Sequence, residues 1–240
     1  MRSIPTVASR LKKTNLAHLG FLGPVIRAEV GDVIEVVFMN NASLNYSVQP
    51  HGVFFNKSNE GSGTKIAHPG LKRLTILCDQ ARLTLIGGLC PRKWVLPRLT
   101  RNASRGYTPP AWIPSRTLMQ KGSLNDDNTQ KNIDKEYVLL FTVTDENESW
   151  YQEKNKNRAN KPNEVDEADE DYQESNKMHG INGYMYANLP GLDMCLGDKV
   201  SWHMIGLGNE VDIHTAYFYG NTFVYNGNIK DTVSLLPGDI

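Results

Sequence analysis

A single histidine stands in a run of alternating β-branched and aromatic residues late in the sequence, Gly206-Leu-Gly-Asn-Glu-Val-Asp-Ile-His214-Thr-Ala-Tyr-Phe-Tyr-Gly220. The alternation and the glycines predict a turn followed by a β-strand that carries His214. Upstream, a Gly-Asp pair ending at Asp198 precedes another strand pattern, Lys-Val-Ser-Trp202. An imidazole on such a strand is either a metal ligand or a hydrogen-bonded structural group. An isolated histidine between apolar neighbours is more often structural.

The same pattern opens the chain, in Gly20-Phe-Leu-Gly-Pro-Val-Ile-Arg-Ala-Glu-Val-Gly-Asp32-Val-Ile-Glu-Val-Val-Phe38. The two copies indicate an internal repeat at the scale of a domain. In the second half, the alternation predicts strands near 136–143, 199–205 and 211–218. The chain is therefore expected to be all-β, built from β-sandwich domains.

The composition excludes some classes of partner. Lys plus Arg and Asp plus Glu each number 26 among 240 residues, so no global field recruits nucleic acid or an anionic membrane surface. No apolar run approaches the ~18–20 residues that span a bilayer, and no signal peptide is visible in the first residues. Asn-X-Ser tripeptides hint at a secreted protein and give glycosylation candidates: Asn41, Asn45, Asn56, Asn102 and Asn147.

Several long blocks resemble cupredoxin domains of the ceruloplasmin and hephaestin ferroxidases. They are His18-Leu-Gly-Phe-Leu-Gly-Pro-Val-Ile-Arg-Ala-Glu-Val-Gly-Asp32, Asp134-Lys-Glu-Tyr-Val-Leu-Leu-Phe-Thr-Val-Thr-Asp-Glu-Asn147, Gln173-Glu-Ser-Asn-Lys-Met-His-Gly-Ile-Asn-Gly183 and Gly208-Asn-Glu-Val-Asp-Ile-His214. The resemblance covers about 17–64 and 121–237 and is best to the middle cupredoxin pair, on the hephaestin side. It implies tandem Greek-key β-sandwiches, both incomplete here, from a secreted or cell-surface oxidase that uses copper.

This resemblance divides the chain into a tail at 1–16, a first domain at 17–132 and a second at 133–240, the latter with an acidic loop at 146–175. Seven of the eleven residues 164–174 are acidic, which favours a solvated loop. Residues 65–120 depart from the family, are rich in proline and basic residues, and have Asp79 as their single acid. One codon choice for 90–107, read out of phase, gives an amino-acid sequence that resembles the family. We therefore predict a frameshift, with a real insertion or an alternative exon as the alternatives, and an irregular or weakly packed segment at 65–120.

A type 1 copper site needs two imidazoles, a cysteine thiolate and usually a weak axial Met. The resemblance places His214 at the first imidazole position, and residues 215–240 contain no Cys, His or Met to complete the set. Cys195 matches a family cysteine whose disulfide partner lies beyond this sequence. No His-X-His pair for a trinuclear cluster is present, so this chain alone is expected to be inactive, and no catalytic residue is assigned.

The resemblance also matches Glu174, His179 and Glu210 to residues that help to bind iron beside the type 1 copper. Carboxylate oxygens with one imidazole suit Fe(II) and stabilise Fe(III) further through charge. By sequence alone, these three would be ordinary surface charges, and a further family carboxylate is absent. We therefore expect a partial iron site, with Fe(II) as substrate, whereas His51 and His203 are expected to be structural.

Three hypotheses follow from these patterns. The chain is a fragment of a multicopper ferroxidase that oxidises Fe(II) with O2 in iron and copper homeostasis, with iron ions and the other cupredoxin domains as partners. Alternatively, it is a non-enzymatic domain pair like the A domains of coagulation cofactors, acting through protein contacts. The third alternative is an inactive product of a faulty gene model. The Glu174, His179, Glu210 and His214 set favours the first.

Overall fold

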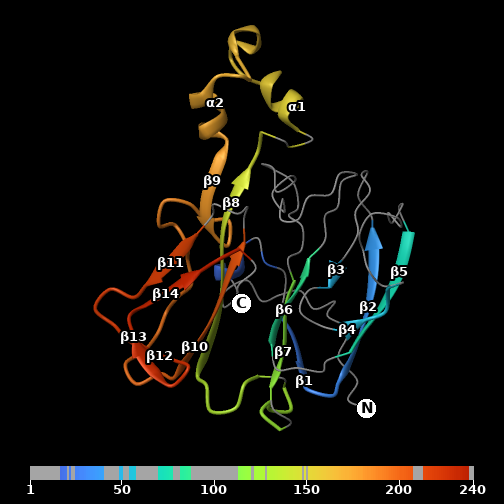
Figure 1. Ribbon diagram of the computed structural model, residues 1–240, viewed down its shortest axis with the longest axis vertical. Coiled ribbons are helices and arrows are strands. Elements are labelled where there is room, and N and C mark those ends of the chain that lie inside the picture. Colours follow the sequence, from blue (N-terminus) through green and yellow to red (C-terminus); the bar gives the residue numbers. More distant parts are fainter. Residues whose placement is uncertain are drawn as a thin grey trace.

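The computed structural model contains two groups of strands, β1 to β7 and β8 to β14, which lie beside each other (Figure 1). The described residues are 17–20, 22, 25–40, 49–50, 54–57, 70–77, 82–87, 113–119, 122–127, 129–147, 149, 151–207 and 213–237. No helix among them is both long and apolar enough to cross a membrane.

The first group contains a short 3-10 helix, η1 (Ala17–Leu19), and seven strands. These are β1 (Ile26–Glu29), β2 (Val33–Asn40), β3 (Gln49–Pro50), β4 (Phe54–Phe55), β5 (Gly70–Leu77), β6 (Arg82–Gly87) and β7 (Ile113–Met119). One sheet has the order β1-β7-β6-β3 and another the order β2-β5-β4. β1 and β7 are parallel, and the other pairs are antiparallel.

The second group begins with β8 (Lys135–Asp145), which lies between β10 (Val200–Leu207) and β9 (Lys177–Ile181). Two small antiparallel sheets follow, β11 (His214–Tyr217) with β14 (Thr232–Leu235), and β12 (Phe223–Tyr225) with β13 (Asn228–Lys230). Between β8 and β9 the chain forms α1 (Gln152–Lys156), η3 (Pro162–Glu164) and α2 (Glu170–Ser175), which project beyond the ends of both strands (Figure 1).

The core of the second group lies on one face of β8, which we call the core face. Val138 and Leu140 alternate along the strand and therefore point to the same side. They pack with Ile205 and Leu207 of β10, and with Leu19 and Leu22 from the N-terminal segment. Ile205 is fully buried, so this face ties the two groups of strands together through apolar contact.

The turn after β9 adds a polar tie to the same N-terminal segment. Asn182 and Gly183 have φ values of 53° and 81°, as a two-residue type I′ hairpin turn requires. The fully buried Asn182 side chain donates to the carbonyls of His18, at 2.5 Å, and Val138, at 2.9 Å. It also accepts from the Leu140 amide at 2.6 Å, so one amide side chain joins η1, β8 and the turn.

The strand predictions for the second half are confirmed, because β8, β10 and β11 overlap the expected strands, although β11 is shorter than expected and 211–212 lie outside the described residues. The acidic residues of 164–174 are exposed, as expected of a solvated segment, but the stretch at 146–175 is not all loop, because it contains α1, η3 and α2. The boundaries at 132 and 133 stay predictions, and the tail at 1–16 lies outside the described residues.

The expectation of an irregular segment at 65–120 is wrong for its described residues. They form β5, β6 and β7, each of which lies between two other strands. Gly-Leu-Lys-Arg-Leu-Thr-Ile-Leu and Arg-Leu-Thr-Leu-Ile-Gly are rich in Leu, Ile and Thr, which suits paired strands. Pro114 pairs in register with Leu85, an unusual position because proline cannot donate to the ladder. The frameshift itself stays a prediction.

Candidate metal centre

His214 is the first residue of β11, where it pairs with Leu235 of β14. Its ring lies 6.2 Å from the ring of Phe141 on β8, at an interplanar angle of 40°. Its Nε2 atom is buried and has no hydrogen-bond partner among the described residues. A buried polar atom without a partner is unfavourable in a purely structural role, which favours a ligand there.

Gly206 allows β14 to approach closely enough to place His214 over β8. Gly206 pairs in register with Phe141, so both lie on the same face of the sheet. A Cβ atom added to Gly206 would meet the Leu236 carbonyl oxygen at 2.5 Å and the Leu235 Cβ at 3.1 Å. Because Leu235 pairs with His214, the absence of a side chain at Gly206 fixes the approach of the strand beside the histidine.

Glu174 lies in the last turn of α2, with 64% of its side chain exposed. Lys177 donates from Nζ to the Glu174 Oε2 atom at 2.7 Å. This hydrogen bond and the lysine charge lower the pKa of Glu174, and the charge of His179 lowers it further. Glu174 is therefore an ionised, solvent-facing carboxylate within electrostatic reach of an imidazole.

His179 lies in the middle of β9, and its side chain is exposed. It pairs with Val143 of β8, and Ile181 pairs with Phe141. Directly opposed residues of an antiparallel pair point to the same face, so His179 shares the face of Phe141. We call the side of the sheet defined by Phe141, Val143, Ile181 and His179 the histidine face, because the ring of Phe141 also meets His214 on it.

The structure thus brings together part of the predicted set. Glu174 and His179 are neighbours, and His179 shares the histidine face with the Phe141 ring beside His214, about 7 Å of strand away. Glu210 and His51 lie outside the described residues. Within the described ranges, no three His, Cys, Asp or Glu side chains are grouped so that they could hold a metal ion.

Cys195 does not contribute to this site. It is exposed and lies in a turn, where its amide donates to Asp198 Oδ2 at 2.7 Å. The turn precedes β10, whereas His214 packs near Gly206 at the other end of that strand, about 20 Å further along. Among the described residues, the site therefore has the imidazole of His214 but no cysteine thiolate near it. A type 1 copper does not fit this set of side chains. The predicted disulfide of Cys195 stays a prediction.

A polar cluster on the opposite side of β8 was not expected from the sequence. Glu136 accepts from Arg27 of β1 at 2.7 Å and lies 3.0 Å from His203 Nε2, which is also 3.1 Å from Ser201 Oγ. Burial would raise the pKa of Glu136, but His203 and Arg27 outweigh it and hold that pKa well below its usual range. Serine and carboxylate share one ring nitrogen, so this is not the relay of a catalytic triad. His203 is thus a member of a polar cluster, and its structural role stays a prediction.

A second unexpected histidine lies in η1. His18 is buried, neither ring nitrogen has a partner among the described residues, and burial lowers its pKa. Its ring meets Tyr137 edge-on at 5.1 Å between centroids. Nothing in the sequence marks this position, because the contact depends on tertiary packing.

The glycosylation candidates differ in accessibility. Asn56 is exposed, and Asn41, Asn45 and Asn102 lie outside the described residues. Asn147 donates from Nδ2, the atom that would carry a sugar, to the Gln173 carbonyl at 2.8 Å, and accepts from Asn176 at 3.0 Å. In this conformation Asn147 is a structural residue, and glycosylation at either described site stays a prediction.

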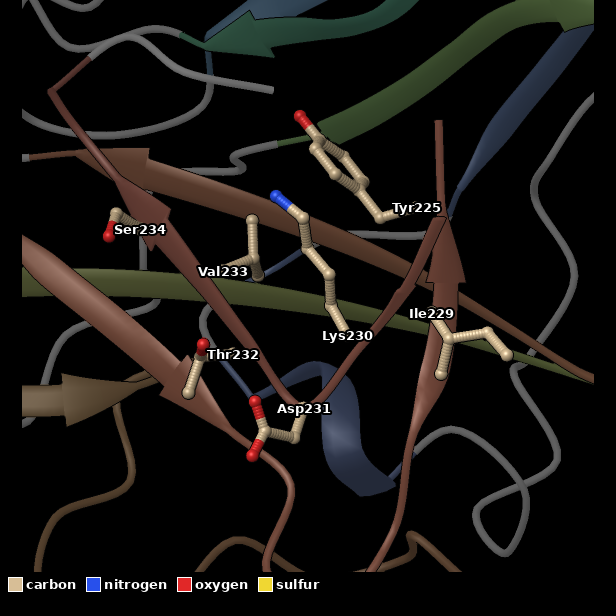
Figure 2. Close-up of a pocket in the computed structure, with 7 residues that line it drawn as sticks. All are labelled: Tyr225, Ile229, Lys230, Asp231, Thr232, Val233 and Ser234. Atoms are coloured by element: carbon tan, nitrogen blue, oxygen red, sulfur yellow. The ribbon is translucent and has the colours of Figure 1, made fainter. Parts of the chain in front are cut away.

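A pocket of about 530 Å³ lies beside β13 and β14 (Figure 2). Its lining residues are Tyr225, Ile229, Lys230, Asp231, Thr232, Val233 and Ser234. Lys230 Nζ lies 5.3 Å from the centre of the Tyr225 ring. With a single carboxylate and a neighbouring ammonium, the lining does not suit a metal ion.

The sequence was compared with known proteins. The chain is 40% identical to hephaestin of Mus musculus over 247 residues, 97% of this chain and 21% of that protein. It is 41% identical to ferroxidase HEPHL1 of Homo sapiens over 237 residues, 91% of this chain and 20% of that protein. It is 40% identical to ceruloplasmin of Rattus norvegicus over 242 residues, 92% of this chain and 22% of that protein.

These identities do not separate the hephaestin and ceruloplasmin branches. The chain spans about a fifth of the length of each of these curated relatives. A span of 97% of the chain includes much of 65–120, the segment in which no resemblance was expected. No model of a protein family matches the chain.

Solved structures show the fold. The blue copper oxidase from Nitrosomonas europaea superposes with a TM-score of 0.55 at 19% identity, covering 89% of this chain and 63% of that one. The copper nitrite reductase from Nitrosomonas europaea gives 0.51 at 17% identity, covering 91% and 71%. The all-β, cupredoxin-like fold predicted from the sequence is therefore confirmed. Over the region that it spans, the chain belongs to the family of hephaestin and ceruloplasmin.

Proposed function

We propose that this chain is part of a multicopper ferroxidase and contributes a surface at which Fe(II) binds. The observation that supports this most directly is the placement of Glu174 and His179. An ionised carboxylate and an imidazole lie within electrostatic reach of each other, exposed to solvent, and His179 shares the histidine face with the ring that packs against His214. The relative HEPHL1 is named as a ferroxidase.

The chemistry of the two side chains suits a ferrous substrate. Carboxylate oxygen and imidazole nitrogen both bind iron, and the negative charge of Glu174 favours Fe(III) over Fe(II). Exposure lets a hydrated ion enter without opening the core. Glu210, which precedes His214 by four residues, is proposed as a further oxygen ligand.

Oxidation needs more than these residues. In the whole oxidase, bound copper would supply the electron-accepting chemistry, and the copper ligands that the described residues lack would come from elsewhere in the protein. His214 is proposed as one copper ligand. We further propose that the protein works outside the cell, with iron ions and the remaining cupredoxin domains as partners.

The binding of Fe(II) to the 240-residue chain tests this proposal. Isothermal titration of Fe²⁺ under argon should show weaker binding to Glu174→Gln and to His179→Ala than to the unaltered chain. Glu164→Gln is the matched control, because Glu164 is an exposed glutamate of the same acidic segment that also pairs with a lysine, at 2.8 Å. Equal affinities for all four proteins would contradict the proposed site.

A further inference from the structure

Lys177 forms an ion pair with the Glu174 carboxylate, which is a proposed iron ligand. Its Nζ lies 2.7 Å from Glu174 Oε2, and the two side chains are 42% and 64% exposed. Lys177 is the first residue of β9, two positions before His179, so both point to the same face of the strand. The ammonium group therefore contacts one proposed iron ligand and lies on the same side as the other.

An ion that binds Glu174 must compete with this contact. A lysine ammonium has only donors, so it cannot join a metal's ligand set, and its charge repels a cation. Exposed pairs of this kind contribute little to stability, so Lys177 can be displaced without unfolding. Asp145 lies opposite Lys177 in register on β8 and offers the displaced ammonium a second carboxylate.

We propose that Lys177 sets the affinity of the Glu174 and His179 site by competing with Fe(II) for the carboxylate. When no ion is bound, the ammonium group neutralises and orients Glu174. When Fe(II) is bound, the ammonium group lowers the affinity of the site for the ion. Such competition favours release of the product ion from the site. This inference rests on the proposed function.

The experiment is anaerobic titration of the 240-residue chain with Fe²⁺, using Lys177→Gln and Lys177→Arg. Lys177→Gln removes the charge and should tighten binding about two- to fivefold, as expected for loss of an exposed ion pair. Lys177→Arg keeps the charge and should not tighten it. The matched control is Lys161→Gln, which should leave the affinity unchanged. Lys161 forms an exposed ion pair with Glu164, three residues away, with Nζ 2.8 Å from Oε2.

Two failures can be told apart. If Glu174→Gln and His179→Ala weaken binding but Lys177→Gln leaves it unchanged or weaker, the competition is overturned and the iron site stands. If neither Glu174→Gln nor His179→Ala weakens binding, the proposed function fails, and the role of Lys177 fails with it. A urea unfolding midpoint for Lys177→Gln equal to that of the unaltered chain would show that a change in affinity does not come from lost structure.

Discussion

The charged groups on the two sides of β8 differ in their exposure to solvent. On the core-face side, Glu136 is enclosed and bound by Arg27 and His203, with side-chain exposures of 10%, 26% and 11%. At the edge of the histidine face, Glu174 and His179 are exposed, and one lysine is in contact with the carboxylate. Enclosed charges that have hydrogen-bond and ion-pair partners stabilise the fold, whereas an exposed charge can exchange its partner for a metal ion. The comparison predicts large effects on stability from the first side and effects on binding from the second.

The largest effect on stability is expected from the apolar part of the core face. Ile205→Ala leaves a cavity at a fully buried position and should lower the free energy of unfolding by about 2–5 kcal/mol. Urea unfolding followed by fluorescence measures this. Ile229→Ala is the control, since Ile229 is 77% exposed and its loss should change stability by about 0.5 kcal/mol or less. Equal losses in both variants would contradict the position of the core.

Glu136→Gln should have the next largest effect. It removes the charge that Arg27 and His203 share and leaves a partly buried guanidinium without its counter-ion, at a cost of about 2–3 kcal/mol after allowance for the exposure of Arg27. The comparison is Glu167→Gln, which breaks the exposed pair with Lys156 and should cost about 1 kcal/mol or less. If both substitutions cost the same, the distinction between enclosed and exposed ion pairs would fail.

Asn182→Gly isolates the hydrogen bonds of the buried amide from its backbone conformation. Glycine adopts the φ of 53° without strain, so the loss reports the three side-chain hydrogen bonds. We expect about 1–3 kcal/mol, because buried groups of η1 and β8 lose their partners. Asn182→Ala should cost more, since it adds backbone strain at a positive φ. The reverse order would contradict the assigned turn.

Acid should weaken the enclosed side in two steps. His18 has a lowered pKa when folded, so the unfolded chain binds more protons and stability falls as pH drops below about 6.5. Glu136 also has a lowered pKa, so its contribution is present above about pH 4.3 and is lost as pH falls further. Urea midpoints between pH 7.5 and 5 measure the first step, and midpoints followed down to about pH 2 measure the second. His18→Phe should remove the first step, and its persistence would show that another group causes it.

The sequence predicted the local parts of this structure. Alternation located β8, β10 and β11. It could not predict the Arg27–Glu136 contact, which joins residues 109 apart in the sequence and depends on how the strands pack. For the site, resemblance identified His214, Glu174 and His179, but the shared face follows from the register of β9 on β8. At 65–120, proline and charge argued against strands, yet the Leu, Ile and Thr residues pair.

The smallest effect on stability is expected where the effect on binding is largest. Glu174→Gln and His179→Ala should each leave the urea unfolding midpoint close to that of the unaltered chain, because both side chains are exposed. Urea unfolding of both variants checks this. A loss similar to that of Glu136→Gln would mean that these residues support the fold rather than a ligand.

A double-mutant cycle on Fe²⁺ affinity tests the central claim that Glu174 and His179 bind the same ion. The 240-residue chain, Glu174→Gln, His179→Ala and the double variant would be titrated with Fe²⁺ under argon. Ligands of one ion lose their effects together, so the double variant should bind only slightly more weakly than either single variant, with a coupling of about 0.5–3 kcal/mol. Losses that simply add, or no loss in either single variant, would contradict a shared iron site on the histidine face.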